Sequence, residues 1–133
     1  MRSAESRNYA TRYLQKAEEY LEAAQDSLDL ERATPAAGDA IHAGISAKDA
    51  IVTFLKGTTG KRKDHGAAPR ELRQALGNHA EAASAERSLR DLIAIKGDVE
   101  YGTTLITLAK AEPVVRRARS LVDLAVEIVR AGR

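Results

Sequence analysis

The chain has 133 residues with 21 Lys and Arg against 19 Asp and Glu, so any affinity for nucleic acid must come from local clusters of charge. This length fits one domain with one core. The absence of Cys excludes disulfides, thiolate zinc sites and cysteine nucleophiles. No apolar run is long enough for a membrane span or a signal peptide, so we expect one domain, 1–133, in the cytoplasm and without a membrane partner.

The N-terminal segment predicts a long amphipathic helix over about residues 4–29. Apolar residues recur there at steps of three and four, as a helix with one buried face requires: Leu14, Ala17, Leu21, Ala24 and Leu28. Tyr9, Tyr13 and Tyr20 lie along the edge of this stripe. We expect their rings to be buried and their hydroxyls to reach water.

A second helix is predicted to begin at Thr34 and Pro35 and to end at Gly57. Thr34 can cap the helix, and Pro35 sits where the missing N–H costs nothing. Small residues, including Ala43 and Gly44, alternate with Ile and Val along it, which lets neighbouring helices approach closely. We interpret it as the central helix of the fold.

One face of this central helix is polar. Asp39, His42, Ser46, Asp49 and Thr53 follow one another at steps of three and four residues. The first four, with Tyr101 from a later segment, are candidates for a polar pocket, and the alternative is a solvent face or a satisfied interhelical network. One nitrogen donor and no clear third ligand do not support a metal site, and we expect no cofactor.

Residues 57–66, "GTTGKRKDHG", predict a loop that is followed by a short helix ending at Gly77. Its cations, with two arginines of the short helix, form the candidate nucleic-acid-binding segment: Lys61, Arg62, Lys63, Arg70 and Arg73. His65 is the candidate acid or base, with Arg62 on phosphate. The alternative is a solvated basic turn in which His65 has a structural role.

The last third of the chain predicts a helix over about 81–96, an irregular segment "GDVEYGTTLI", and a final helix from Thr107 or Pro113 to Arg130. The final helix has an unusually wide apolar stripe, so we expect a second subunit to cover part of it. The candidate interface residues are Val115, Val122 and Val129. The fold class is all-α, an antiparallel bundle of four long helices and one short helix.

The order of these features resembles the HEPN superfamily of small helical-bundle proteins, especially its minimal single-domain members. The resemblance rests on "AEEYLEAAQDSL", on "AGDAIHAGISAKDAIVTFLKG", on the "DHG" of residues 64–66, on "GDVEYG" and on the closing helix "AEPVVRRARSLVDLAVEIV". It covers roughly residues 9–130. It implies a cytoplasmic homodimer, often encoded beside a nucleotidyltransferase antitoxin in a toxin–antitoxin pair.

Catalytic members of that superfamily resemble metal-independent endoribonucleases, with an Arg followed by a His four to six residues later near a late helix. No such pair stands near "AIKGDVEYG", and Arg62 precedes His65 by only three residues. We therefore expect a dimeric binding or regulatory module, non-catalytic or degenerate, in a toxin–antitoxin or RNA-related defence system. The alternatives are a metal-independent endoribonuclease acting on RNA and a structural dimer that binds a partner.

Overall fold

The computed structural model describes residues 3–59 and 65–132, and in that part of the chain every regular element is a helix. The elements, in chain order, are α1 (Ala4–Asp29), α2 (Ala33–Lys56), the 3-10 helix η1 (His65–Ala67), α3 (Ala68–Leu76), α4 (Ala82–Ala94), α5 (Lys96–Tyr101) and α6 (Leu108–Ala131). The prediction of an all-α helical bundle is confirmed.

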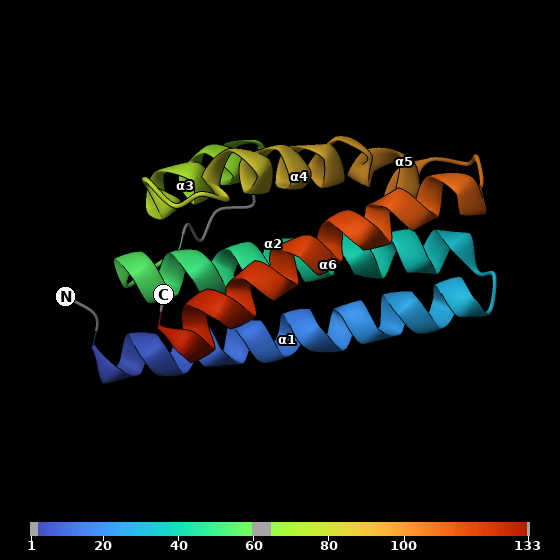
Figure 1. The fold of residues 1–133 in the computed structure, drawn as a ribbon. Helices are drawn as coiled ribbons and strands as arrows, with labels where there is room; N and C mark the ends of the chain where they lie inside the picture. Colours follow the sequence, from blue (N-terminus) through green and yellow to red (C-terminus); the bar gives the residue numbers. More distant parts are fainter. Residues whose placement is uncertain (1–2, 60–64, 133) are drawn as a thin grey trace.

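Helix α2 lies in the middle of the bundle, as predicted. It packs against α1 and α6 on one side and against α3, α4 and α5 on the other, and α1 also contacts α6. Figure 1 shows α1 and α2 running in opposite directions, with α3, α4 and α5 following one another along a second layer. The largest fully buried side chains come from five helices and form one core: Leu14, Ile41, Ile51, Leu72, Leu89, Leu92, Leu121 and Ile128.

The helix ends follow from local hydrogen bonds. Ser3 caps α1 by accepting a 3.0 Å bond from the Ser6 N–H, and Thr107 caps α6 by accepting one from Lys110. Gly57 ends α2 with φ of 91°, which a residue with a Cβ rarely adopts. The predicted cap at Thr34 is wrong, because α2 begins at Ala33 and Thr34 lies inside its first turn.

Gly44 marks the closest approach of α2 to its neighbours. A Cβ placed on it would overlap the Leu92 side chain of α4 and lie 3.4 Å from Leu121 Cδ1 of α6. Leu92 and Leu121 are both buried in the core. The absence of a side chain at Gly44 therefore allows the three helices to meet.

One feature of the last third of the chain differs from the prediction. Residues 96–101, expected to be largely irregular, form the short helix α5. Of the two starts predicted for the final helix, the one at Thr107 is confirmed, because Thr107 caps α6 and Pro113 lies inside it. Proline has no N–H to donate to the carbonyl of Ala109, four residues earlier.

The valines chosen as the dimer interface do not form a free surface. Val115 and Val122 are only 2% and 3% exposed and belong to the core of the single chain, and Val129 packs against that core. The outer face of α6 instead carries charged residues such as Arg116, Arg119 and Asp123. The apolar stripe of α6 is wide because α6 contacts α1, α2 and α4 at once. A dimer interface would therefore have to use other residues.

Candidate functional site

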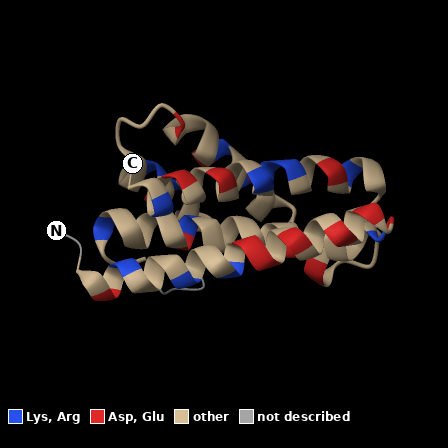
Figure 2. Ribbon diagram, turned by 60° about the horizontal axis from the view of Figure 1, so that its bottom comes forward, with Lys and Arg blue, Asp and Glu red and all other residues tan. Residues whose placement is uncertain are grey.

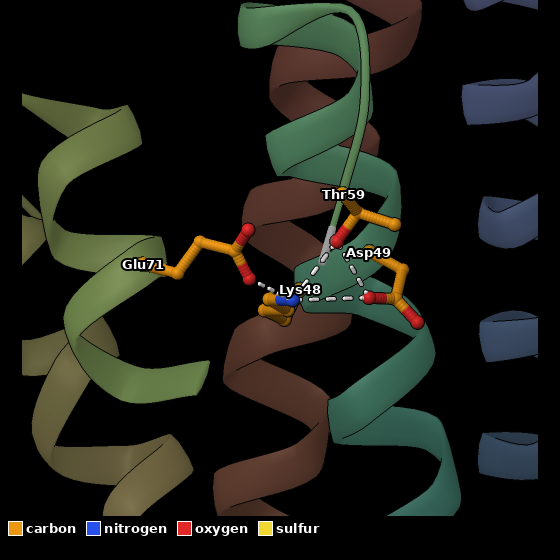
Figure 3. Close-up of polar contacts among 4 residues, drawn as sticks. All are labelled: Lys48, Asp49, Thr59 and Glu71. Carbon is orange, nitrogen blue, oxygen red and sulfur yellow. Dashed lines mark hydrogen bonds and ion pairs between the residues drawn. The ribbon is translucent and has the colours of Figure 1, made fainter. Parts of the chain in front are cut away.

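A buried lysine joins three parts of the chain. Lys48 of α2 is 3% exposed, and its ammonium contacts Asp49 Oδ1 at 3.2 Å, Thr59 Oγ1 at 2.9 Å and the Glu71 carboxylate of α3. The Thr59 hydroxyl donates to Asp49 Oδ1 at 2.9 Å. Figure 3 shows these side chains converging on the Lys48 nitrogen from α2, from the segment after α2 and from α3. We call these four residues the lysine network.

The lysine network is complete as a hydrogen-bonding unit. A lysine ammonium has three N–H donors, and the three oxygens named above accept them. The Thr59 hydroxyl accepts from Lys48 and donates to Asp49. The network thus fixes Thr59 and the start of α3 against the middle of α2.

A cavity of about 410 Å³ opens between the first turns of α1 and the end of α2. Its polar wall consists of side chains that carry a hydroxyl group: Ser6, Tyr9, Tyr13, Thr53, Thr58 and Thr59. Glu5 is the one charged residue that lines it among the described residues. Ser6 donates a 3.0 Å hydrogen bond to the carbonyl of Gly57, which holds the two walls together. We call this cavity the hydroxyl pocket.

Thr53 is the deepest polar residue of the hydroxyl pocket. It is 2% exposed, and within residues 3–59 and 65–132 its Oγ1 has no hydrogen-bond partner. A threonine in a helix often returns its hydroxyl to a carbonyl one turn earlier, and this one does not. A buried hydroxyl without a partner carries a desolvation penalty.

Cations gather around the hydroxyl pocket without lining it. The blue residues of α1 lie in its N-terminal half and the red ones mostly in its C-terminal half (Figure 2). Arg7, Arg12 and Lys16 of α1 and Lys56 at the end of α2 are exposed, and we call these four residues the basic end. Arg12 lies over the Tyr9 ring, with its Cζ 5.8 Å from the ring centroid.

A second polar group connects α1, α2 and α5. Glu100 Oε1 lies 3.4 Å from His42 Nε2, and Glu100 Oε2 accepts a 2.7 Å bond from Lys96. The Tyr20 ring stacks on His42 with centroids 5.2 Å apart, and the Lys96 ammonium lies 5.7 Å from the Tyr101 ring centroid. We call these five residues the histidine cluster. It joins a carboxylate, an imidazole and an ammonium at the surface.

The ion pair in this cluster predicts a pH effect. The hydrogen bond from Lys96 lowers the pKa of the Glu100 carboxyl below its ordinary 4.5, and the same bond raises the pKa of Lys96. Because the pKa of Glu100 is lowered by folding, its contribution is present above pH 4.5 and is lost as the pH falls through the folded value. Glu100→Gln should therefore cost about 0.5 kcal/mol at pH 7 and less at pH 3.

Urea unfolding of both proteins at the two pH values measures this difference. Glu127→Gln, on the exposed face of α6, is the matched control and should show no such change. A difference between wild type and Glu100→Gln that stays constant with pH would contradict the assigned ion pair.

Only part of the predicted nucleic-acid-binding segment lies within the described residues. Lys61, Arg62 and Lys63 lie outside the described residues. Arg70 is exposed on α3, and Arg73 donates a 2.9 Å bond to Glu86 of α4, a carboxylate that it shares with Arg90. His65 is half-buried at the start of η1.

The predicted polar face of α2 is divided between two sites. His42 lies in the histidine cluster, and so does Tyr101, which comes from α5. Asp49 belongs to the lysine network, seven residues or roughly 10 Å further along the helix. Ser46 is buried and Asp39 is half-buried. The five candidates therefore do not form one pocket.

Lys48, Glu71 and Thr59 were not among the predicted site residues. The signal available for Lys48 was its place on the apolar face of α2, four residues after Gly44 and three before Ile51. A lysine at such a position needs buried partners. Nothing in the sequence positions of Thr59 and Glu71 indicated that these two residues would be the partners of Lys48.

Comparisons with known proteins identify no relative, so the function has to be inferred from the side chains described above. No protein-family model matches the chain, and no curated protein matches it significantly. Within the described ranges, no three His, Asp or Glu side chains are grouped so that they could hold a metal ion. No helix of that part has both the length and the apolar character needed to span a membrane.

Proposed function

We propose that this protein is a HEPN-like, single-domain, dimeric module that binds RNA without cutting it, as a regulatory component of a toxin–antitoxin or RNA-related defence system. The observation that carries this proposal is the basic end beside the hydroxyl pocket. Exposed cations on the same helix ends as a cavity suit a polyanion that binds along them. A nucleotidyltransferase antitoxin is the further partner that the HEPN resemblance implies, and a cytoplasmic location accords with it.

Three cations of the basic end, Arg12, Lys16 and Lys56, are available for a phosphate backbone. In the described part of the chain no carboxylate forms an ion pair with Arg12, Lys16 or Lys56. By contrast, Arg73, Arg90, Arg117 and Arg130 elsewhere on the surface are each paired with a carboxylate. Binding to the basic end should therefore be electrostatic and weakened by salt.

The test is fluorescence anisotropy with a labelled single-stranded RNA over a salt series. The triple change Arg12→Glu, Lys16→Glu and Lys56→Glu should weaken binding at least 30-fold, and it should reduce the slope of log affinity against log salt by about 2. The charge-matched control reverses three exposed cations elsewhere, Arg87, Lys110 and Arg116. Equal losses in both variants, or no salt-dependent binding by wild type, would contradict the proposal.

The dimer is tested in the same preparation by sedimentation velocity, which should give twice the chain mass of 14.4 kDa. A structural dimer that binds only a protein partner remains the alternative if RNA does not bind.

A second candidate, metal-independent endoribonuclease, is favoured by the histidine cluster more than by His65 and Arg62. His42 has a carboxylate beside Nε2 and an ammonium close by, and its side chain is 45% exposed. In such an arrangement the imidazole would move the 2′-hydroxyl proton, while Lys96 would attract the phosphate. Glu100 would orient the imidazole.

RNA cleavage assayed with a metal chelator present separates the two functions. Under the endoribonuclease hypothesis His42→Ala abolishes cleavage and leaves RNA affinity unchanged. His65→Ala tests the other candidate histidine. If this variant loses cleavage and His42→Ala does not, His65 is the catalytic residue. Intact RNA with wild-type protein would reject the enzyme and leave the binding module.

A further inference from the structure

A groove opens where α5 and the first turns of α6 separate. Helix α4 packs against α6, whereas the Cα atoms of α5 all lie more than 8 Å from those of α6. The cavity in this groove has a volume of about 430 Å³, which is within the range for small-ligand pockets. Figure 1 shows α5 and the start of α6 at the end of the bundle opposite to the start of α1. We call this cavity the α5–α6 groove, and it is separate from the hydroxyl pocket.

The floor of the α5–α6 groove is aliphatic. Val114 is only 3% exposed, and Ile95 and Ile106 pack against the core of the bundle. An apolar group that enters the groove therefore exchanges contact with water for contact with these side chains, which is favourable. The apolar residues that line the groove are Ala94, Ile95, Ile106, Ala109, Pro113 and Val114.

The two walls of the groove carry charges of opposite sign. At one end Arg117 Nε of α6 lies 3.2 Å from Asp91 Oδ2 of α4, and this ion pair joins the walls. Asp98 comes seven residues after Asp91 on one wall. Lys110 comes seven residues before Arg117 on the other wall, and both Asp98 and Lys110 line the groove. In the part of the chain that the structure describes, neither of these two forms an ion pair.

The backbone of α6 adds a hydrogen-bond acceptor to the groove. Because Pro113 has no N–H, the carbonyl of Ala109 lacks the donor that a helix normally supplies four residues later. Together with the Asp98 carboxylate, this carbonyl can accept hydrogen bonds from an ammonium group, while the Lys110 ammonium can only donate. A ligand with a single charge would leave one wall without a partner, so the groove suits a ligand that carries both charges.

We propose that the α5–α6 groove binds a free α-amino acid with an aliphatic side chain, such as leucine. The ammonium group of the ligand pairs with Asp98 and donates to the Ala109 carbonyl. Its carboxylate pairs with Lys110, and its side chain packs on the aliphatic floor. This inference goes beyond the proposed function and does not depend on RNA binding, because the groove shares no residue with the basic end.

Calorimetric titration with leucine and two analogues tests the match of charges. Isocaproate has the carbon skeleton of leucine without the ammonium group, and isoamylamine lacks the carboxylate. Leucine should bind with one molecule per chain, and each analogue should bind at least about tenfold more weakly, because one charged hydrogen bond is missing. Analogues that bind as tightly as leucine would overturn the proposal, since the groove would then recognise only the apolar part.

Three substitutions place the ligand in the groove. Asp98→Asn and Lys110→Met should each weaken leucine binding about tenfold. Asp98→Asn should leave the affinity for isocaproate unchanged, and Lys110→Met should leave that for isoamylamine unchanged. Ala94→Leu fills the groove at an exposed position and should abolish binding. The matched controls Asp123→Asn and Arg116→Met change exposed charges of α6 that do not line the groove, and they should bind leucine as wild type does.

The other outcomes are equally decisive. If wild type does not bind leucine, or if the groove variants and the controls weaken its binding equally, the proposal is wrong. If Ala94→Leu converts a dimer into a monomer in sedimentation velocity, a second copy of the chain occupies the groove, which also overturns the proposal. Loss of RNA binding in the triple variant of the basic end should leave leucine binding unchanged, so that failure of the proposed function and failure of this inference are distinguishable.

Discussion

Replacing Lys48 with methionine is expected to lower the free energy of unfolding by about 3 kcal/mol. The change keeps most of the side-chain volume and removes the ammonium that Asp49, Thr59 and Glu71 share. Two carboxylates then face the site with no cation between them. The side chains of Asp49 and Glu71 are 21% and 34% exposed, so water relieves part of the cost, which places the effect near the lower end for a broken buried ion pair.

Chemical denaturation at pH 7 measures the loss. Lys110→Met, at an exposed position of α6, is the control and should change stability by less than about 0.5 kcal/mol. Adding Asp49→Asn and Glu71→Gln to Lys48→Met should recover most of the loss, because the two carboxylates then no longer repel each other across the site. A single Lys48→Met variant as stable as the control would refute the buried network.

Gly44→Ala is expected to destabilise the protein by about 2 kcal/mol, although alanine is the better helix former. The new Cβ overlaps the Leu92 side chain and crowds Leu121, so α4 or α6 must move away from α2. Both leucines are in the core, with little free space into which they could move. This strain exceeds the gain of about 1 kcal/mol in helix propensity.

Gly38→Ala in the same helix is the matched control, and it is expected to raise the stability of the protein where Gly44→Ala lowers it. A Cβ there meets only Val99 Cγ1, at an ordinary 3.6 Å. Propensity should then dominate and raise stability by about 0.5 to 1 kcal/mol. Stabilisation by both substitutions would mean that α2 does not approach α4 at Gly44 as the structure has it.

The helices could be predicted from the sequence because their signals are local. The stripe from Leu14 to Leu28 and the terminator Gly57 depend on residues within one or two turns, and the structure places α1 and the end of α2 accordingly. The segment around Tyr101 was missed as a helix because Gly97 and Gly102 indicate a break. Residue 102 ends α5, whereas Gly97 lies inside it.

The sites could not be predicted to the same extent, because their contacts are distant in sequence. His42 meets Glu100 across 58 residues, and Lys48 meets Glu71 of another helix. A polar face on α2 was visible in the sequence, but its division between the histidine cluster and the lysine network depends on which helices pack nearby. The cavity near Thr53 depends on α1 lying beside the end of α2, which periodicity does not reveal.

The charges at the C-terminal end of α1 run against the dipole of that helix. Backbone peptide dipoles favour acids in the first turn and bases in the last; α1 has Glu5 in its first turn, but it ends with Asp26 and Asp29 and has no base in its last turn. Packing of the apolar stripe of α1 against α2 and α6 therefore has to supply most of the stability of this helix, because its own charges add little.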